Sequence, residues 1–185
     1  MNKIDESLKL GANELRNTLP SPEELAKIKK NHVYLIVDNV MDTYNIGSIF
    51  RLADAVAATK VILCEGSETP PHTRIKKASI NTTEWVDWEY SKDVAKAIKD
   101  LRKKIKGIQV VAVELDKKSK SYTEIEYTFP LALVVGHETR GLSQKTLKEC
   151  DAIAEIPMWG VNKSMNVVMS LGIVLFEAMK RMNKV

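Results

Sequence analysis

From residue 33 onward, short apolar runs rich in β-branched residues alternate with amphipathic segments of helical period. This alternation limits the possible folds more than any other feature, because strands that alternate with helices pair in parallel and are buried beneath those helices. The chain is therefore predicted to form an α/β domain, with a mainly parallel sheet and helices on both faces. The predicted strands are residues 33–37, 61–64, 85–88, 109–113, 131–135 and 152–156.

The segment before the first predicted strand has a different pattern. Apolar residues recur at roughly helical spacing from Ile4 to Leu15, and Ser21-Pro22-Glu23-Glu24 combines an N-cap, a first-turn proline and a capping-box acid. Two short helices are thus expected before the sheet. We divide the chain into an N-terminal helical extension, residues 1–30, and a main domain, residues 31–185.

Composition restricts the class of protein. The 185 residues are 44% hydrophobic, enough for one substantial core, and a net charge of +4 means that any nucleic-acid surface must be a local patch. Cys64 and Cys150 form no C-x-x-C pair, which argues against a disulfide framework or a cysteine metal site. The start has no apolar signal region, and no run approaches the ~18 to 20 apolar residues of a membrane span. We therefore expect a cytoplasmic protein.

Two later segments have the apolar faces of helices. Residues 92–105 place apolar side chains on one face and basic ones on the others, which is typical of a helix that covers a sheet. The last segment has a wider stripe, which suits a core, an interface between subunits, or both. Its apolar members are Val167, Val168, Leu171, Val174, Leu175, Ala178, Met179 and Met182.

Three polar loops follow predicted strands, where open parallel sheets bind their ligands. The first, residues 38–51, runs into a helix and contains Asn45 and Arg51. The second, residues 136–142, has glycines on either side of a single acid, a pattern typical of close backbone approach to a ligand. The third, residues 156–166, is rich in turn formers and opens the last helix, where free N–H groups favour polar ligands.

Several familiar sites are excluded by the residues in and around these loops. Gly136 and Gly141 resemble the start of a phosphate-binding Walker A loop, but Leu142 follows where a lysine is needed. No G-x-G-x-x-G follows the first predicted strand, so a dinucleotide pocket is not expected. His137 and Glu138 begin like the zinc motif H-E-x-x-H, but its last position is a glycine, and we predict no metal site.

Each polar residue also has a purely structural interpretation. Asn45 could cap a helix, Arg51 could form a surface ion pair, and Ser164 and Asn166 could cap the last helix. Glu138 is harder to explain in this way, because an acid in a tight loop after a buried strand needs partners. Three basic runs are more typical of solvated faces than of RNA contacts. They are residues 74–77, 102–106 and 117–120.

Three motifs occur in order along these loops: N-x-G-x-x-x-R at residues 45–51, G-H-E-T-R-G-L at 136–142, and I-P-M-W-G with S-M-N-V between 156 and 167. Together they resemble the SpoU (TrmH) class of RNA 2′-O-methyltransferases, within the SPOUT superfamily. The resemblance covers roughly residues 31–182, and three ordered motifs are far more specific than one. The chain departs from the usual family residues at His137 and at Met165.

The resemblance implies a fold, an activity and partners. It implies the SPOUT fold, in which a parallel α/β sheet ends in a deep C-terminal trefoil knot that binds S-adenosylmethionine, and it implies a homodimer. The expected activity is methyl transfer to a ribose 2′-hydroxyl of RNA, and we expect tRNA rather than rRNA. DNA is not an expected substrate, because it lacks the 2′-hydroxyl. The alternative is a non-catalytic knotted protein that binds RNA or assists assembly.

The resemblance also implies roles for single residues. Arg51 is expected to anchor a phosphate and stabilise the developing alkoxide, because a guanidinium rarely gives up its proton. Asn45 and Asn166 would orient the sugar, Glu138 would fix the loop or a cationic neighbour, and Ser164 would cap the last helix while touching the site. The expected cofactor-binding residues are Leu115, Gly136, Glu138, Gly141, Ile156, Met158, Gly160, Ser164 and Met165.

Overall fold

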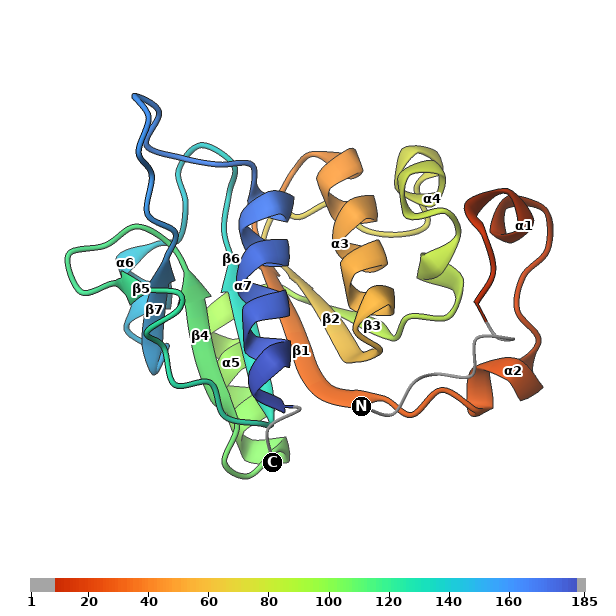
Figure 1. The fold of residues 1–185 in the computed structure, drawn as a ribbon, viewed down its shortest axis with the longest axis horizontal. Helices are drawn as coiled ribbons and strands as arrows, with labels where there is room; N and C mark the ends of the chain where they lie inside the picture. Colours follow the sequence, from red (N-terminus) through yellow and green to blue (C-terminus); the bar gives the residue numbers. More distant parts are fainter. Residues whose placement is uncertain (1–8, 183–185) are drawn as a thin grey trace.

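The computed structural model describes residues 9–182, which form one twisted sheet with helices on both faces (Figure 1). The sheet has seven strands in the order β3-β2-β1-β6-β4-β7-β5, and every strand pair is parallel. The prediction of a mainly parallel α/β sheet is confirmed. The strands are β1 (Asn31–Asp38), β2 (Ala58–Cys64), β3 (Trp88–Ser91), β4 (Gln109–Val113), β5 (Lys120–Ser121), β6 (Leu131–Val135) and β7 (Ala152–Glu155).

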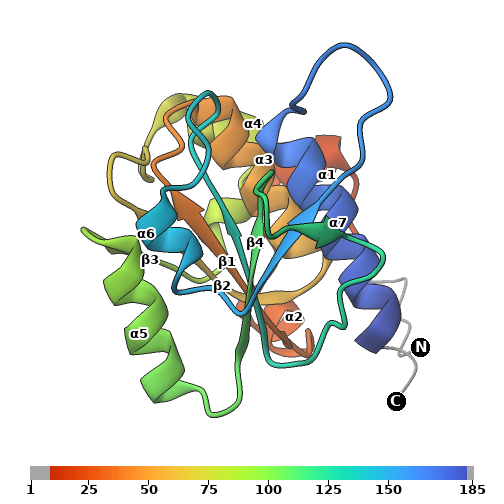
Figure 2. The same ribbon diagram turned by 90° about the vertical axis from the view of Figure 1, so that its left-hand side faces the viewer.

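Helices cover the two faces of the sheet, and successive residues of β1 show which helices lie on which face. Leu35 packs in the same core as α3 and α7, whereas Ile36 packs in the core of α5, as the alternation of side chains along a strand requires. Figure 2 shows α5 and α6 on one side of the sheet and α3 and α7 on the other. The helices are α3 (Thr43–Ala55), α4 (Thr73–Ser79), α5 (Val94–Lys104), α6 (Gln144–Leu147) and α7 (Val167–Met182).

In the part of the chain that the structure describes, no helix is both long and apolar enough to span a bilayer.

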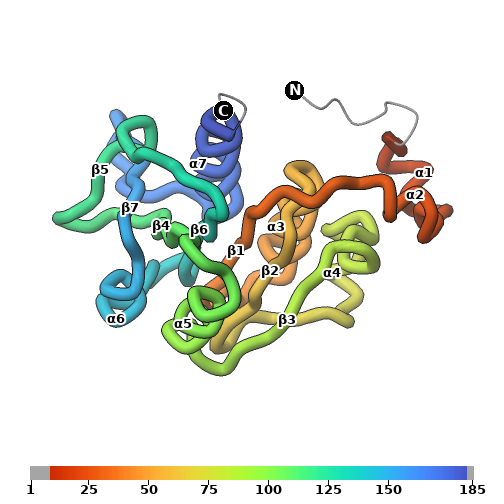
Figure 3. Tube along the Cα trace, turned by 90° about the horizontal axis from the view of Figure 1, so that it is seen from below, coloured from red at the N-terminus to blue at the C-terminus, as the bar shows by residue number. Residues whose placement is uncertain are grey.

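Two short helices precede the sheet, as predicted, and are α1 (Ala12–Asn17) and α2 (Pro22–Ala26). Ser21 caps α2 through a capping box: its Oγ accepts from Glu24 N at 3.2 Å, and its own N–H donates to Glu24 Oε2 at 2.7 Å. α1 lies beside α4 (Figure 1 and Figure 3), and Asn81 Nδ2, just after α4, donates to Leu15 O of α1 at 2.8 Å. Ile4 and Leu8 of the predicted first helix lie outside the described residues. The division of the chain at residue 30 stays a prediction.

The predicted strand at residues 85–88 is wrong. The chain forms a short 3₁₀ turn at Thr82–Glu84, and β3 begins only at Trp88. Trp85 is turned toward α3 instead, where its Nε1 donates to Asp54 Oδ1 at 2.7 Å. A tryptophan whose N–H finds a partner off the sheet is drawn away from the strand ladder, although its apolar character is that of a strand residue.

The last strands are not ordered as they follow one another along the chain. β7 lies between β4 and β5, so that Val113 and Lys120 both pair with Ala154, one on each side. Residues 114–119 therefore arch from one side of β7 to the other at its carboxyl end. This arrangement brings the loops after β4, β6 and β7 together at one edge of the sheet.

Candidate functional site

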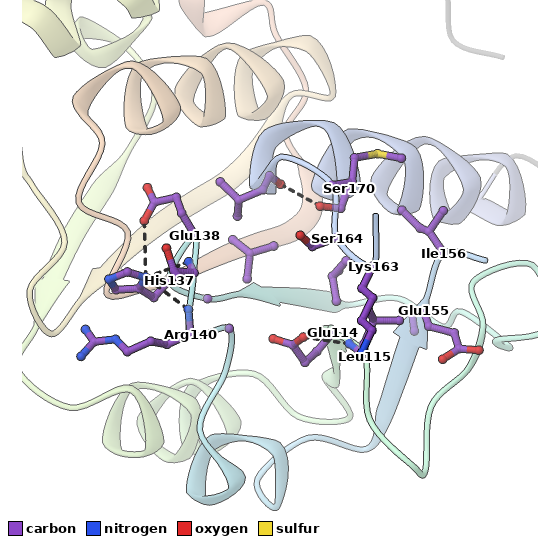
Figure 4. A pocket seen from close by; sticks show the side chains of 18 of the residues that line it. Glu114, Leu115, His137, Glu138, Arg140, Glu155, Ile156, Lys163, Ser164 and Ser170 are labelled. Atoms are coloured by element: carbon purple, nitrogen blue, oxygen red, sulfur yellow. Dashed lines mark hydrogen bonds and ion pairs between the residues drawn. The ribbon is translucent and has the colours of Figure 1, made fainter. Parts of the chain in front are cut away.

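A cavity of about 490 Å³ lies at that edge, formed by the loops that follow β4, β6 and β7 and by the start of α7 (Figure 4). It contains residues from both ends of the third predicted loop and from most of the second. Eight of the expected cofactor-binding residues line it: Leu115, Gly136, Glu138, Gly141, Ile156, Met158, Ser164 and Met165. The ninth, Gly160, does not, and lines an adjacent hollow of about 280 Å³.

Two glycines allow the loop after β6 to fold tightly along the cavity. A Cβ on Gly136 would lie 2.6 Å from the carbonyl carbon of Gly141, and a Cβ on Gly141 would collide with the carboxylate of Glu114. Gly141 also has φ +63°, in the left-handed region that side chains disfavour. Backbone from the two ends of the loop therefore packs together in a way that only glycine permits.

Glu138 ties this loop to the loop after β1. Its Oε1 accepts from the backbone N–H of Asp42 at 3.1 Å and from Asn45 Nδ2 at 3.0 Å, while its Oε2 accepts from Met41 N at 3.5 Å. Burial alone would raise the pKa of Glu138, but the hydrogen bonds outweigh burial and hold its pKa below the ordinary value. The carboxylate is thus kept ionised as an acceptor at the junction of two loops.

Asn45 extends the network to α7. Its Oδ1 accepts from Asn166 Nδ2 at 3.1 Å, and Asn166 Oδ1 in turn accepts from the N–H groups of Val168 and Met169 at 2.9 and 3.3 Å. Three polar residues from three separate motifs are therefore joined in the order Glu138, Asn45, Asn166. Neither asparagine lines the cavity.

The capping residue of α7 differs from the expectation. Asn166 caps the helix and Ser164 does not, because a cap must lie next to the first turn to reach its free N–H groups. Ser164 lines the cavity, and its N–H donates to Asn162 Oδ1 at 3.1 Å. Asn45 is not the cap of α3 either, since Asp42 Oδ1 accepts from Tyr44 N at 2.7 Å.

Arg51 stands apart from this network. It is exposed on α3, it does not line the cavity, and its side chain forms no hydrogen bond or ion pair with any residue from 9 to 182. Its interpretation as a surface ion-pair partner therefore finds no support in the described chain.

Glu114 was not predicted by any motif, yet it has a central position. It is the first residue after β4, and its two carboxylate oxygens accept from Leu115 N at 2.8 Å and from Leu142 N at 2.7 Å. Its place directly after a predicted strand was the only signal in the sequence.

His137 and Lys163 also line the cavity. His137 Nδ1 accepts from Thr139 N at 3.0 Å and so supports the turn of its own loop.

The basic runs are partly engaged in contacts within the chain. Arg102 donates to Asp151 Oδ1 at 2.9 Å and to Glu149 O at 3.1 Å, which links α5 to the loop before β7. Lys76 Nζ lies 3.2 Å from Glu84 Oε1.

Among residues 9–182, no group of three or more His, Cys, Asp or Glu side chains is arranged to hold a metal ion.

Comparison with known proteins points to one family. Residues 32–176 match the SpoU rRNA Methylase family. The chain is 32% identical to a tRNA (guanosine(18)-2′-O)-methyltransferase of Aquifex aeolicus over 171 residues, which is 90% of this chain and 78% of that protein. Several other curated relatives are longer, and the chain spans only 60–66% of their length.

Solved structures agree with this match. The crystal structure of an A. aeolicus TrmH/SpoU tRNA modifying enzyme superposes with a TM-score of 0.76 at 27% identity, covering 94% of this chain and 83% of that one. An AdoMet-bound rRNA methyltransferase from Sinorhizobium meliloti gives a TM-score of 0.73 at 30% identity, covering 90% of this chain and 59% of the other.

Proposed function

This chain belongs to the SpoU rRNA Methylase family, and we propose that it is an enzyme that transfers a methyl group from S-adenosylmethionine to a ribose 2′-hydroxyl of RNA. The observation that carries the proposal is the cavity of about 490 Å³ at the carboxyl edge of the sheet, which is lined by the loops of the second and third motifs and by the loop after β4. The preference for tRNA rests on the 32% identity to the Aquifex tRNA enzyme. A cytoplasmic location stays a prediction.

The residues around the cavity fit the proposed cofactor. Its volume lies in the range of small-molecule sites. Leu115 and Met158 line it and are 48% and 37% exposed, so apolar side chains are available to an adenine ring. Glu114, Glu138 and Glu155 also line the cavity, which suits a cofactor that carries a positive sulfonium. When bound, S-adenosylmethionine supplies an activated methyl group.

Three side chains of this chain have different roles in the proposed reaction. Glu138 is a weak base, because three donors occupy its carboxylate and its pKa is lowered, so it positions the loops rather than accepting the ribose proton. Arg51 is free to bind an RNA phosphate and to stabilise negative charge on the 2′-oxygen as its proton leaves. Asn45, held between Glu138 and Asn166, fixes the start of the helix that carries Arg51.

We propose that the segment after β7 is threaded as a deep trefoil knot. The support is the arch of residues 114–119, which runs from one side of Ala154 to the other around the strand that continues into α7. The resemblance to the SPOUT superfamily implies the same threading. A crystal structure whose backbone passes beside the arch instead of through it would contradict this proposal.

We propose that the functional unit is a homodimer formed through α7. One side of this helix is buried in the core, yet Met169, Ile173 and Phe176 follow one another at i, i+4 and i+7 on another side and are 59%, 36% and 50% exposed. The resemblance implies a second copy as the occupant of that side. Phe176→Asp is expected to shift the molar mass in light scattering toward the monomer, whereas Val161→Asp, at a fully exposed loop position, is the control.

The activity itself is tested with labelled S-adenosylmethionine and unmodified tRNA and rRNA, followed by nuclease digestion and nucleoside analysis. A labelled 2′-O-methylnucleoside is the expected product, and the RNA that carries it identifies the substrate. Tight binding of the cofactor and of RNA without any transfer would favour the alternative, a non-catalytic knotted RNA-binding protein.

A further inference from the structure

The carboxylate of Glu114 links two loops that line the cavity. Its Oε1 accepts from the N–H of the next residue, Leu115, at 2.8 Å, and its Oε2 accepts from Leu142 N at 2.7 Å. Leu115 belongs to the loop after β4, and Leu142 ends the loop after β6. Figure 4 shows Glu114 beside Leu115 at the floor of the cavity. One side chain thus holds the backbone of both loops.

The neighbouring residues are fitted to this carboxylate. Gly141 packs so closely against Glu114 that any Cβ would collide with the carboxylate, and Gly136 packs in turn against Gly141. The positive φ of Gly141, +63°, turns the chain so that the next N–H, that of Leu142, points at Glu114. The glycines of the second motif are therefore explained in part by a residue outside it.

We propose that Glu114 is a positioning residue of the methyl-donor site, one that sets the backbone of Leu115 and of Gly141-Leu142 in the conformation that the cofactor needs. This inference rests on the proposed function. Since the Leu115 N–H is already engaged, the backbone group that Leu115 offers to a ligand is its carbonyl, an acceptor suited to an amino group. The Glu114 carboxylate thus determines that the loop after β4 offers a ligand a backbone acceptor rather than a donor.

The chemistry of the pair of bonds requires a carboxylate. Two backbone N–H groups need two acceptor oxygens, and glutamine supplies one oxygen and one NH₂ donor. Glu114→Gln keeps the size of the side chain but turns a donor toward one of the two N–H groups. An unmade hydrogen bond at such a site costs enough to weaken binding about tenfold.

Negative charge in the cavity could attract the sulfonium without any positioning, and the chain contains a control for this effect. Glu155 lines the same cavity, and its Oε2 accepts from the hydroxyl of Ser119. Glu155→Gln removes the same charge while it keeps an oxygen for that hydroxyl. S-adenosylhomocysteine, whose sulfur is neutral, gives a second control on the ligand side.

The experiment measures the Kd of S-adenosylmethionine and of S-adenosylhomocysteine by calorimetry for wild type, Glu114→Gln and Glu155→Gln. Positioning predicts that Glu114→Gln weakens the neutral S-adenosylhomocysteine by about tenfold. S-adenosylmethionine should be weakened by at least the same factor, with the lost charge adding no more than about threefold. Glu155→Gln is expected to weaken S-adenosylmethionine by less than about threefold. Equal losses in the two variants, or a loss in Glu114→Gln confined to the charged ligand, would overturn the inference.

Two further readouts keep the inference testable. If Glu114→Gln does not fold, Glu114→Asp, which keeps both acceptor oxygens on a shorter stem, is expected to fold and to bind both ligands more weakly than wild type. Affinity for unmodified tRNA, measured by filter binding, should change less than about twofold in any folded variant. Wild-type protein that binds neither ligand would refute the proposed function instead, so the two failures are distinguishable.

Discussion

The two sides of the proposed active site differ in how completely one chain builds them. On the donor side, the loops after β4, β6 and β7 enclose a cavity whose carboxylates and glycines are engaged with one another. On the acceptor side, Arg51 is exposed on α3 and has no partner among residues 9–182. The difference indicates that residues 9–182 of one chain build the donor side more completely than the acceptor side.

The network from Glu138 through Asn45 to Asn166 joins the two sides. It crosses from the loop after β6 to the start of α3 and then to the start of α7. Loops held together by hydrogen bonds lose little entropy when a ligand binds, which favours affinity. Changes on the donor side should therefore affect cofactor binding, and changes on the acceptor side should affect turnover.

The largest effect is expected at Arg51. Arg51→Ala should lower kcat by roughly 10²–10³-fold, because it removes charge stabilisation at the reacting oxygen. The Kd of S-adenosylmethionine should stay within about twofold of wild type, since Arg51 does not line the cavity. Arg51→Lys keeps the charge but loses the planar guanidinium, so its kcat should lie between those of wild type and Arg51→Ala. A wild-type rate in the alanine variant would remove Arg51 from the reaction.

A smaller effect is expected at Gly141, on the donor side. Gly141→Ala places a methyl group against Glu114 and should weaken S-adenosylmethionine by about tenfold, as overpacking typically costs 1–3 kcal/mol. Gly107→Ala is a matched control, since Gly107 also has positive φ, +75°, but has open space around its Cβ position. In both variants, alanine at a positive φ should lower the free energy of unfolding in urea by about 1–2 kcal/mol. Equal cofactor affinities in the two variants would contradict a tight donor site.

The smallest effect is expected from the titration of Glu138. Its folded-state pKa is lowered, so it stabilises the fold above its ordinary pKa of 4.5, and the stabilisation is lost as the pH falls through the lower, folded-state value. The difference in unfolding free energy between wild type and Glu138→Gln should therefore be largest at neutral pH and shrink below about pH 4.5. Urea unfolding across this range measures it. A difference that grew on acidification would mean that Glu138 is not stabilised as a carboxylate.

The local sequence pattern predicted the bounds of strands correctly where the strand is central in the sheet and buried on both faces. The bounds of β4 and β6 agree with the predicted residues 109–113 and 131–135, because continuous apolar runs have few alternatives in such a sheet. The local sequence pattern did not predict the short elements. The four residues of α6 and the two of β5 were not predicted, because elements of that length have no measurable period.

The sequence alone determined the α/β class and two of the three loops that line the cavity, those after β6 and β7. Both results follow from order along the chain, because apolar runs make the strands and parallel strands end at one edge. The sequence did not determine the partners of the site residues. That Glu138 binds Asn45, that Asn166 binds Asn45, and that Glu114 holds Leu142 all depend on segments 28 to 121 residues apart meeting in space. Such contacts arise from strand order and packing, which no local pattern encodes.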